Sequence, residues 1–192
     1  MRECDNIVYE LELTERSSCC SSCNRLVTIG EFEHRQSGRL ICAMNTHFDH
    51  NGVVARQKSA ELVVDHAREF LKRGYAITLT GDFNSKPDGD AYQTIQNGPN
   101  SPFVDVASLL PETKDTRKYG HVKTYTGFDF RESTKNRIDY AFVAPKQNSP
   151  WDVQGVSVLE TRFDDGIASS DHRPVVADIV LKGIVGVQRE GA

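Results

Sequence analysis

The stretch "LTGDFNSKPDGD", Leu79 to Asp90, joins the end of an apolar run to a polar turn. The run "YAITLTG" is short, apolar and rich in β-formers, which predicts a buried strand. Asp82 and Asn84 follow two residues apart, and residues i and i+2 of a strand share a face. Taken alone, "GDFN" is best explained as a turn closed by the aspartate side chain. Whether it is also part of a functional site depends on the rest of the chain.

Three further segments place polar side chains at or within predicted strands. A buried strand gains nothing from an unpaired carboxylate, so such groups are normally paired or bind a metal ion. If all four segments converge, their carboxylates, amides and imidazoles would suit a hard divalent cation and a phosphate group. The three segments are "NTHFDH" with Asn45, His47, Asp49 and His50, "NRIDY" with Asp139 between Ile138 and Tyr140, and "SDHRP" with Asp171 and His172.

Each segment also has an ordinary structural explanation. Asp139 could pair with Arg137 or Arg131, His47 could be a hydrogen-bonded core histidine, and "SDH" could cap an element. The joint occurrence of all four segments, each at a strand edge, favours a common site.

Composition restricts the class of protein. The chain of 192 residues suits one domain, with 38% hydrophobic and 26% charged residues. A net charge of -4 argues against tight non-specific binding to nucleic acid, although a metal ion can supply local positive charge in a nuclease. No apolar run predicts a transmembrane helix or a secretory signal, so a cytoplasmic or nuclear location is expected.

The cysteines offer a second candidate metal site. An odd count of five and the lack of a signal favour reduced thiols. The cluster "CCSSC" suggests zinc through Cys20 and Cys23, with Cys19 adjacent. A structural zinc site needs a second ligand pair, and none is evident, which favours a polar segment without metal.

The pattern of elements predicts a layered domain. Residues 1–24 form an atypical segment with a possible strand over "IVYELEL", residues 25–183 form the domain, and residues 184–192 form a tail. A hairpin, "RLVTIGEFE" with "RLICAMNTHF", precedes an amphipathic helix over Val53 to Arg73 that Gly74 ends. This order indicates an α/β or α+β domain with a mixed or largely antiparallel sheet. The remaining predictions are short helices over "AYQTIQN" and "FVDVASLL" and strands over "RIDYAFVA", "WDVQGVSVLE" and "RPVVADIVL".

The segments "NTHFDH", "LTGDFN", "NRIDYAFV" and "SDHRPVVADI" resemble, in order, the motifs of the endonuclease/exonuclease/phosphatase superfamily. The matching region spans Asn45 to Ile179. The resemblance implies a four-layered α/β/β/α sandwich of the deoxyribonuclease I-like type. It also implies cleavage of a phosphodiester or phosphomonoester that depends on Mg²⁺, with Mn²⁺ as the alternative ion. The substrate stays open among nucleic acid, inositol phosphate and other phosphate esters.

The resemblance implies a role for each polar residue at the phosphate. His47 would contact the scissile phosphate and assist proton transfer to the leaving group. Asn45 and Asn84 would hold the phosphate, and His172 would act there as a general base or transition-state stabiliser.

The resemblance also assigns the carboxylates. Asp82 would orient and help deprotonate the attacking water and bind metal. Asp139 would support a histidine, and Asp171 would be a metal ligand or a partner of His172. A carboxylate partner fixes the imidazole tautomer and raises the imidazole pKa.

One departure from the family limits what carries over. Family members have an asparagine on an opening strand and a metal-binding glutamate in a "QE"-type motif, and neither motif occurs before Asn45. Glu10, Glu12 and Glu15 lie there in surroundings that do not match. We therefore expect a domain that is incomplete at its N-terminal side, with an uncovered sheet face able to self-associate. The alternative function is a catalytically impaired remnant that binds a phosphate ligand or a protein.

Overall fold

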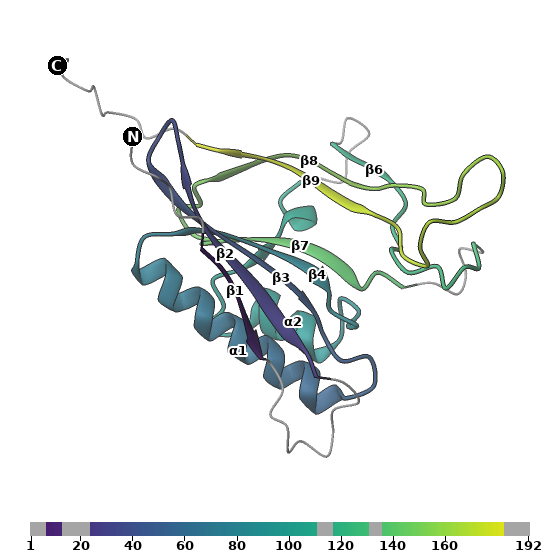
Figure 1. The fold of residues 1–192 in the computed structure, drawn as a ribbon, viewed down its shortest axis with the longest axis horizontal. Coiled ribbons are helices and arrows are strands. Elements are labelled where there is room, and N and C mark those ends of the chain that lie inside the picture. Colours follow the sequence, from purple (N-terminus) through teal and green to yellow (C-terminus); the bar gives the residue numbers. More distant parts are fainter. Residues whose placement is uncertain (1–6, 13–23, 111–116, 131–135, 183–192) are drawn as a thin grey trace.

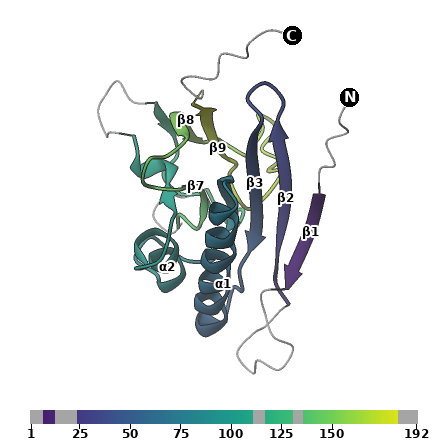
Figure 2. The same ribbon diagram turned by 90° about the vertical axis from the view of Figure 1, so that its left-hand side faces the viewer.

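The computed structural model describes residues 7–12, 24–110, 117–130 and 136–182. These residues form three layers (Figure 1): two helices, a six-stranded sheet and a three-stranded sheet. The helices cover one face of the larger sheet, as the view from the side shows (Figure 2), and the smaller sheet lies over the other face. The predicted α/β sandwich of the deoxyribonuclease I-like type is confirmed, and the described residues form three of its four expected layers.

The larger sheet has the strand order β1-β2-β3-β4-β7-β5. Neighbouring strands are antiparallel except β3 and β4, which are parallel. The predicted hairpin is therefore present as β2 and β3, and the sheet is mixed. The strands are β1 (Ile7–Glu12), β2 (Leu26–His34), β3 (Arg39–His47), β4 (Ala76–Asp82), β5 (Val104–Asp105) and β7 (Asp139–Ala144).

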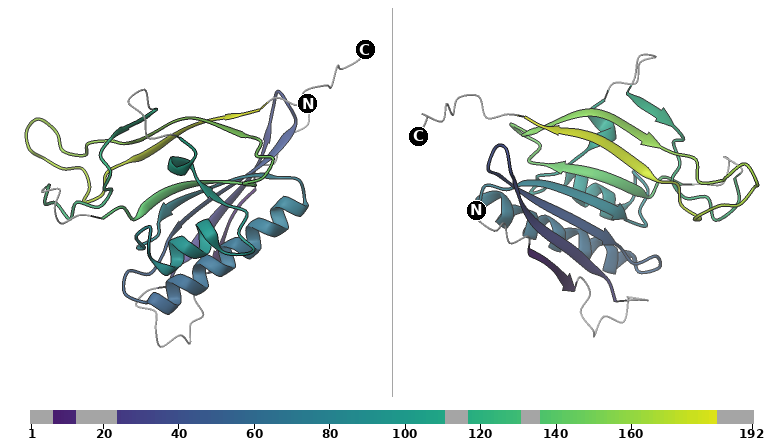
Figure 3. Two further views of the ribbon diagram at one scale, coloured as in Figure 1. Left: turned by 180° about the vertical axis from the view of Figure 1, so that it is seen from behind. Right: turned by 45° about the horizontal axis from the view of Figure 1, so that its top comes forward.

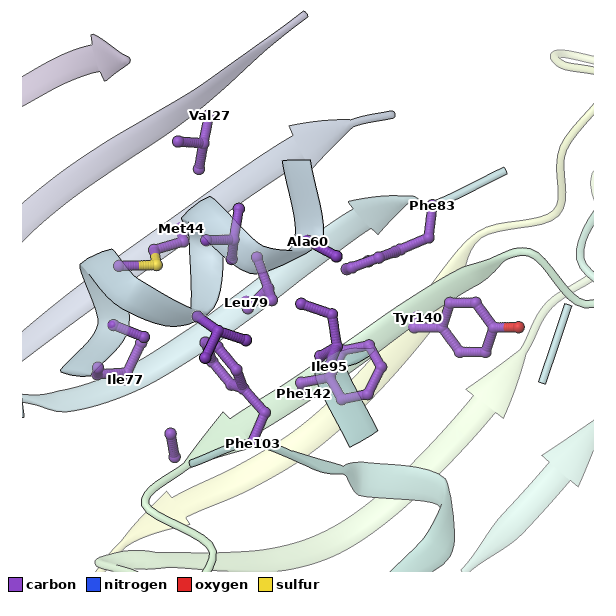
Figure 4. Close-up of a cluster of buried hydrophobic side chains, with 14 of the residues drawn as sticks. Val27, Met44, Ala60, Ile77, Leu79, Phe83, Ile95, Phe103, Tyr140 and Phe142 are labelled. Carbon is purple, nitrogen blue, oxygen red and sulfur yellow. The ribbon is translucent and has the colours of Figure 1, made fainter. Parts of the chain in front are cut away.

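Helix α1 (Val53–Lys72) connects the two parallel strands and packs against the sheet. Its apolar face, with Val63 and Phe70, is buried, as the helical spacing predicts. Gly74 follows with φ +86°, a conformation that favours glycine and ends the helix. The core beneath the sheet joins both helices to the central strands (Figure 4), with these labelled side chains: Val27, Met44, Ala60, Ile77, Leu79, Phe83, Ile95, Phe103, Tyr140 and Phe142.

One of the two predicted short helices, the one over "FVDVASLL", is not an α-helix. Helix α2 (Asp90–Asn97) matches the prediction over "AYQTIQN", but "FVDVASLL" forms β5 and the short 3₁₀ helix η1 (Val106–Ser108). Asp105 explains the difference, because its buried carboxylate accepts the Ala107 N–H at 2.9 Å and pairs with Arg137 at 2.7 Å. Strand pairing with β7 and this buried ion pair override the local helical pattern.

The smaller sheet consists of β6 (Lys118–Gly120), β8 (Trp151–Val158) and β9 (Val175–Leu181), in the order β6-β8-β9. Its inner face forms a second core with the larger sheet, where Trp151 Nε1 donates to the Ile77 carbonyl at 3.0 Å. Over the described residues, no helix covers its outer face (Figure 3). That outer face exposes Val176 and Val180 of β9.

Two further expectations concern the cysteine cluster and membrane-spanning helices. Cys19, Cys20 and Cys23 lie outside the described residues. No helix in the part of the chain that the structure describes is long and apolar enough to cross a membrane.

Candidate active site

Three adjacent strands carry His47, Asp82 and Asp139 in one row. His47 at the end of β3 lies opposite Asp82 at the end of β4, and Asp82 lies opposite Asp139 on β7. Because β3 and β4 are parallel, their carboxyl ends meet at one edge of the sheet, and the antiparallel β7 begins there. Asp139 is thus the first residue of its strand, not an interior one as the sequence suggested.

The Asp82 carboxylate lies between two imidazoles. Its Oδ2 is 3.2 Å from His47 Nε2 and 3.8 Å from His172 Nε2. The other ring nitrogen of His172, Nδ1, lies 2.9 Å and 3.1 Å from the two carboxylate oxygens of Asp139. The carboxylate accepts, so the Nδ1 proton points to Asp139 and Nε2 faces Asp82. Residues far apart in the sequence therefore make one continuous polar cluster.

The local chain geometry explains the motif "GDFN". Gly81 has φ +149°, and a Cβ there would lie 1.9 Å from the Thr46 carbonyl oxygen, so only glycine allows β3 and β4 to approach so closely. Asp82 Oδ1 accepts the Asn84 N–H at 2.8 Å, which closes an Asx turn. The turn interpretation and the site interpretation are both correct, because the same carboxylate shapes the turn and faces the histidines.

Asn84 is oriented by this turn. Its φ is +46°, a left-handed conformation that asparagine tolerates well. Its amide nitrogen donates to the Phe48 carbonyl at 3.0 Å and to Asp82 Oδ2 at 3.4 Å.

The neighbouring residues Thr124 and Tyr125 position Asp139 and His172. The Tyr125 ring lies 5.0 Å from the His172 ring, and the two residues form an isolated β-bridge. Thr124 Oγ1 accepts the N–H groups of Ile138 and Asp139 at 3.0 Å and 3.1 Å. Thr124 and Tyr125 were missed because hydroxyl and aromatic residues in a polar loop carry no distinctive spacing.

The electrostatics of the cluster shift the pKa values of His47 and His172 in opposite directions. The hydrogen bond with Asp139 raises the pKa of His172 above its ordinary value, against the opposing effect of burial. Burial lowers the pKa of His47, although Asp82 opposes this. Burial raises the pKa of Asp82, while the Asn84 N–H lowers it and the nearby Asp139 charge raises it further. His172 therefore holds a proton more readily than His47.

The cluster offers a donor set for a metal ion. One ligand atom each from Asp82, Asp139 and His172 lie within 4.8 Å of one another, and all three residues are partly buried. Two carboxylates held close together raise the local negative potential, which a divalent cation would relieve. Oxygen ligands suit Mg²⁺ and Mn²⁺, so the carboxylates fit such an ion.

Two predicted residues lie beside this cluster. Asn45 is exposed, precedes His47 by two residues on β3, and accepts a hydrogen bond from Thr80 Oγ1 at 2.9 Å. The Asp171 carbonyl accepts the Thr126 N–H at 2.7 Å, and the charge of Asp171 contributes to the raised pKa of His172. The tight group of possible metal ligands contains Asp139 and not Asp171.

Other acidic candidates have separate positions. Asp49 is fully buried, and its Oδ1 accepts the N–H groups of Asn51 and Gly52 ahead of α1, which is a structural role. Glu10 and Glu12 lie on β1, which is separated from β3 by β2. Glu15 lies outside the described residues.

A mixed two-sheet sandwich with an Asp–His cluster where β3 and β4 end defines a deoxyribonuclease I-like protein. The chain belongs to the endonuclease/exonuclease/phosphatase family, whose model matches residues 8–172. The nucleases and phosphatases of this family hydrolyse phosphate esters. No curated protein matches the sequence.

Solved structures agree with this assignment. An endonuclease/exonuclease/phosphatase from Bacteroides vulgatus is 27% identical, with a TM-score of 0.77, over 92% of this chain and 65% of that one. A mannosyl-6-phosphatase from Bacteroides thetaiotaomicron is 26% identical, with a TM-score of 0.72, over 91% and 66%. TDP2 from D. rerio, complexed with a single-strand DNA product, shares the fold at 16% identity, with a TM-score of 0.68, over 92% and 68%. The chain thus spans just under two thirds of the first two relatives' length.

Proposed function

We propose that the cluster hydrolyses a phosphomonoester or phosphodiester by in-line attack of water, with a divalent cation as cofactor. The observation that carries this proposal is the row of His47, Asp82 and Asp139, completed by His172. Asp82 and Asp139 would hold Mg²⁺ or Mn²⁺, with Asp171 as a further candidate ligand. When bound, the ion would polarise the phosphate and neutralise its charge.

The residues of the chain have distinct tasks in this proposal. Protonated His172, held by Asp139, donates from Nε2 to a phosphate oxygen and stabilises the charge that develops there. His47, whose Nε2 lies 3.2 Å from Asp82 Oδ2, exchanges a proton with the leaving group. Asp82 orients the attacking water and accepts its proton, while Asn84 and Asn45 hold phosphate oxygens.

Turnover of generic aryl phosphomonoesters and phosphodiesters by the purified chain tests the proposal. We expect hydrolysis with Mg²⁺ or Mn²⁺ and none with a chelator. His172→Ala should lower kcat about 10²-fold or more, because loss of a positioned proton donor and charge stabiliser typically costs that much. The control His66→Ala, on α1, should leave kcat unchanged.

Two results would contradict hydrolysis at this site. Unchanged turnover in a folded His172→Ala variant would remove its proposed role. Phosphate binding that depends on His172 without turnover in any metal would support the binding-module alternative.

A further inference from the structure

A cavity of about 400 Å³ lies between the two sheets, where β5 is the last strand of the larger sheet and β6 the last strand of the smaller one. Its walls come from α2, β5, η1, all three strands of the smaller sheet and the chain just before β7. None of the four residues of the Asp–His cluster is among the described residues that line it. A cavity of this size can enclose a small organic molecule.

Arg137 is the anchored cation of this cavity. Its Nη2 donates to the two oxygens of Asp105 at 2.9 Å and 2.7 Å, and its guanidinium carbon lies 4.5 Å from the centre of the Tyr140 ring. The same two oxygens also accept the Ala107 N–H at 2.9 Å and the Tyr92 hydroxyl at 3.0 Å. The Asp105 carboxylate is therefore fully used, and it fixes the guanidinium without being able to take a ligand itself.

The remaining donors of Arg137 are available to a ligand. Both bonds to Asp105 come from Nη2, and within the described part of the chain the hydrogens on Nε and Nη1 make no hydrogen bond. The side chain is 21% exposed and lines the cavity. A guanidinium presents its N–H groups in a fixed fork that matches the two oxygens of a carboxylate.

Lys118 adds a second cation to the cavity. It lies opposite Val156 in the pairing of β6 with β8, and Val156 belongs to the core between the sheets, so Lys118 is on the inner face. Asp105 is the only carboxylate among the lining residues that the structure describes, and it offsets the charge of Arg137. His121 also lines the cavity and faces Glu160 at 3.3 Å, which would offset its charge on protonation. The lining therefore carries an excess of about one positive charge.

Apolar side chains complete the walls. Val156 and Val158 of β8 are buried, and Val175 at the start of β9 is partly buried. Such walls gain free energy from contact with an apolar group and gain nothing from an inorganic ion. The combination of apolar walls with one excess positive charge fits an organic anion of low charge.

The chain before β7 connects this cavity to the Asp–His cluster. Arg137 precedes Asp139 by two residues. The carbonyl of the adjacent Asn136 accepts the N–H groups of Thr124 and Tyr125 at 3.1 Å and 3.0 Å. Thr124 in turn holds the Asp139 N–H, as described above. A ligand held by Arg137 would thus act on the same short segment that positions the cluster.

We propose that the cavity is an effector site for a compact organic monoanion. The carboxylate of the ligand would meet Arg137 and Lys118, and its apolar body would lie against the valines. A single excess positive charge favours a monoanion over a phosphate dianion. The site stands apart from the proposed function, because binding there requires no hydrolysis.

NMR titration in chelator tests the site with three probes of one shape. 1-Naphthoate is the monoanion, 1-naphthyl phosphate the dianion and 1-naphthylmethylamine the cation. We expect 1-naphthoate to bind at least about fivefold more tightly than either of the others, with shifts in the amide signals of Asp139 and His172. Saturating inorganic phosphate should not displace it, because the cavity lies outside the cluster.

Two variants change the cavity itself. Lys118→Met keeps the length of the side chain but removes its charge, and should weaken 1-naphthoate about fivefold or more. Ala107→Leu narrows the cavity and should weaken it as well, with Tm showing that the fold is intact. The control Lys146→Met removes the same charge from an exposed position after β7 and should change nothing.

Several results would overturn the site. They are no saturable binding of 1-naphthoate, displacement by inorganic phosphate, equal or tighter binding of the cation or the dianion, and unchanged affinity in folded Lys118→Met or Ala107→Leu. An equal loss in Lys146→Met would show non-specific charge attraction instead. Binding that leaves the Asp139 and His172 signals in place would overturn the effector role.

Discussion

At the scale of single residues, the decisive contact is the one between Asp139 and His172. The Nδ1–Oδ2 distance of 2.9 Å fixes the imidazole orientation and leaves Nε2 facing Asp82. The same hydrogen bond is the main reason that the pKa of His172 is raised. One carboxylate therefore sets both the direction and the charge of the proposed phosphate contact.

Asp139→Asn should lower the pKa of His172, because the amide supplies neither the charge nor the same acceptor pair. The raised pKa means that the charged pair contributes stability fully below a pH of about 6.5, the ordinary histidine value, and loses it as the pH rises through the folded pKa. The Tm difference between wild type and Asp139→Asn should therefore shrink as pH rises through that range. Imidazole NMR titration in chelator, with His66 as reference, measures the pKa. A His172 pKa that stays raised in the variant would contradict this assignment.

At the scale of elements, the site depends on the close approach of β3 and β4. Their parallel pairing brings His47 and Asp82 opposite each other, and Gly81 permits it because its missing Cβ would meet the Thr46 carbonyl. Helix α1 makes this pairing possible because it returns the chain to the edge of the sheet where β3 begins, so that β4 runs parallel to β3. Gly81 is therefore required for the close packing of β3 and β4, and this packing brings His47 and Asp82 together.

Gly81→Ala should lower the free energy of unfolding by at least about 3 kcal/mol, because it combines a strained φ with a steric clash against backbone. Gly74→Ala is the matched control, since Gly74 also has positive φ but nothing lies within 4 Å of an added Cβ. We expect a cost of about 1 kcal/mol there, from the backbone alone. Urea unfolding of both variants measures the difference. Equal costs would show that the close strand contact is not limiting.

At the scale of the whole molecule, the outer face of the smaller sheet carries exposed apolar side chains that no helix of the described residues covers. Val176 and Val180 of β9 point outward with 41% and 48% of their surfaces exposed. The chain covers 65% of the Bacteroides vulgatus relative. An exposed apolar sheet face favours association with another copy or another segment.

We predict self-association of the isolated chain at high concentration through this face. The double variant Val176→Lys and Val180→Lys should raise the monomer fraction in sedimentation velocity, because buried lysine charges oppose the contact. Leu62→Lys, at a position on α1 that is 41% exposed, is the control and should leave the fraction unchanged. If the double variant associates as strongly as the wild type, another surface is responsible.

Much of the site could be predicted from local sequence because its residues lie where strands begin or end. Asp82, His47 and His172 stand beside apolar runs, and this pattern identified the strand ends that carry polar side chains. Helical periodicity located α1 to within one residue. These features are local, since burial of one face imposes a period on neighbouring residues. The sequence by itself thus determined the class of fold and the segments that form the site.

Only the tertiary structure decided which residues meet. His172 bonds to Asp139, which is 33 residues away, although Asp171 is adjacent in the sequence. Residues 104–108 form β5 and a 3₁₀ turn because β7 and Arg137 compete successfully with a local helical pattern. Strand pairing, buried ion pairs and turn conformation depend on partners distant in the chain, and no local pattern encodes them.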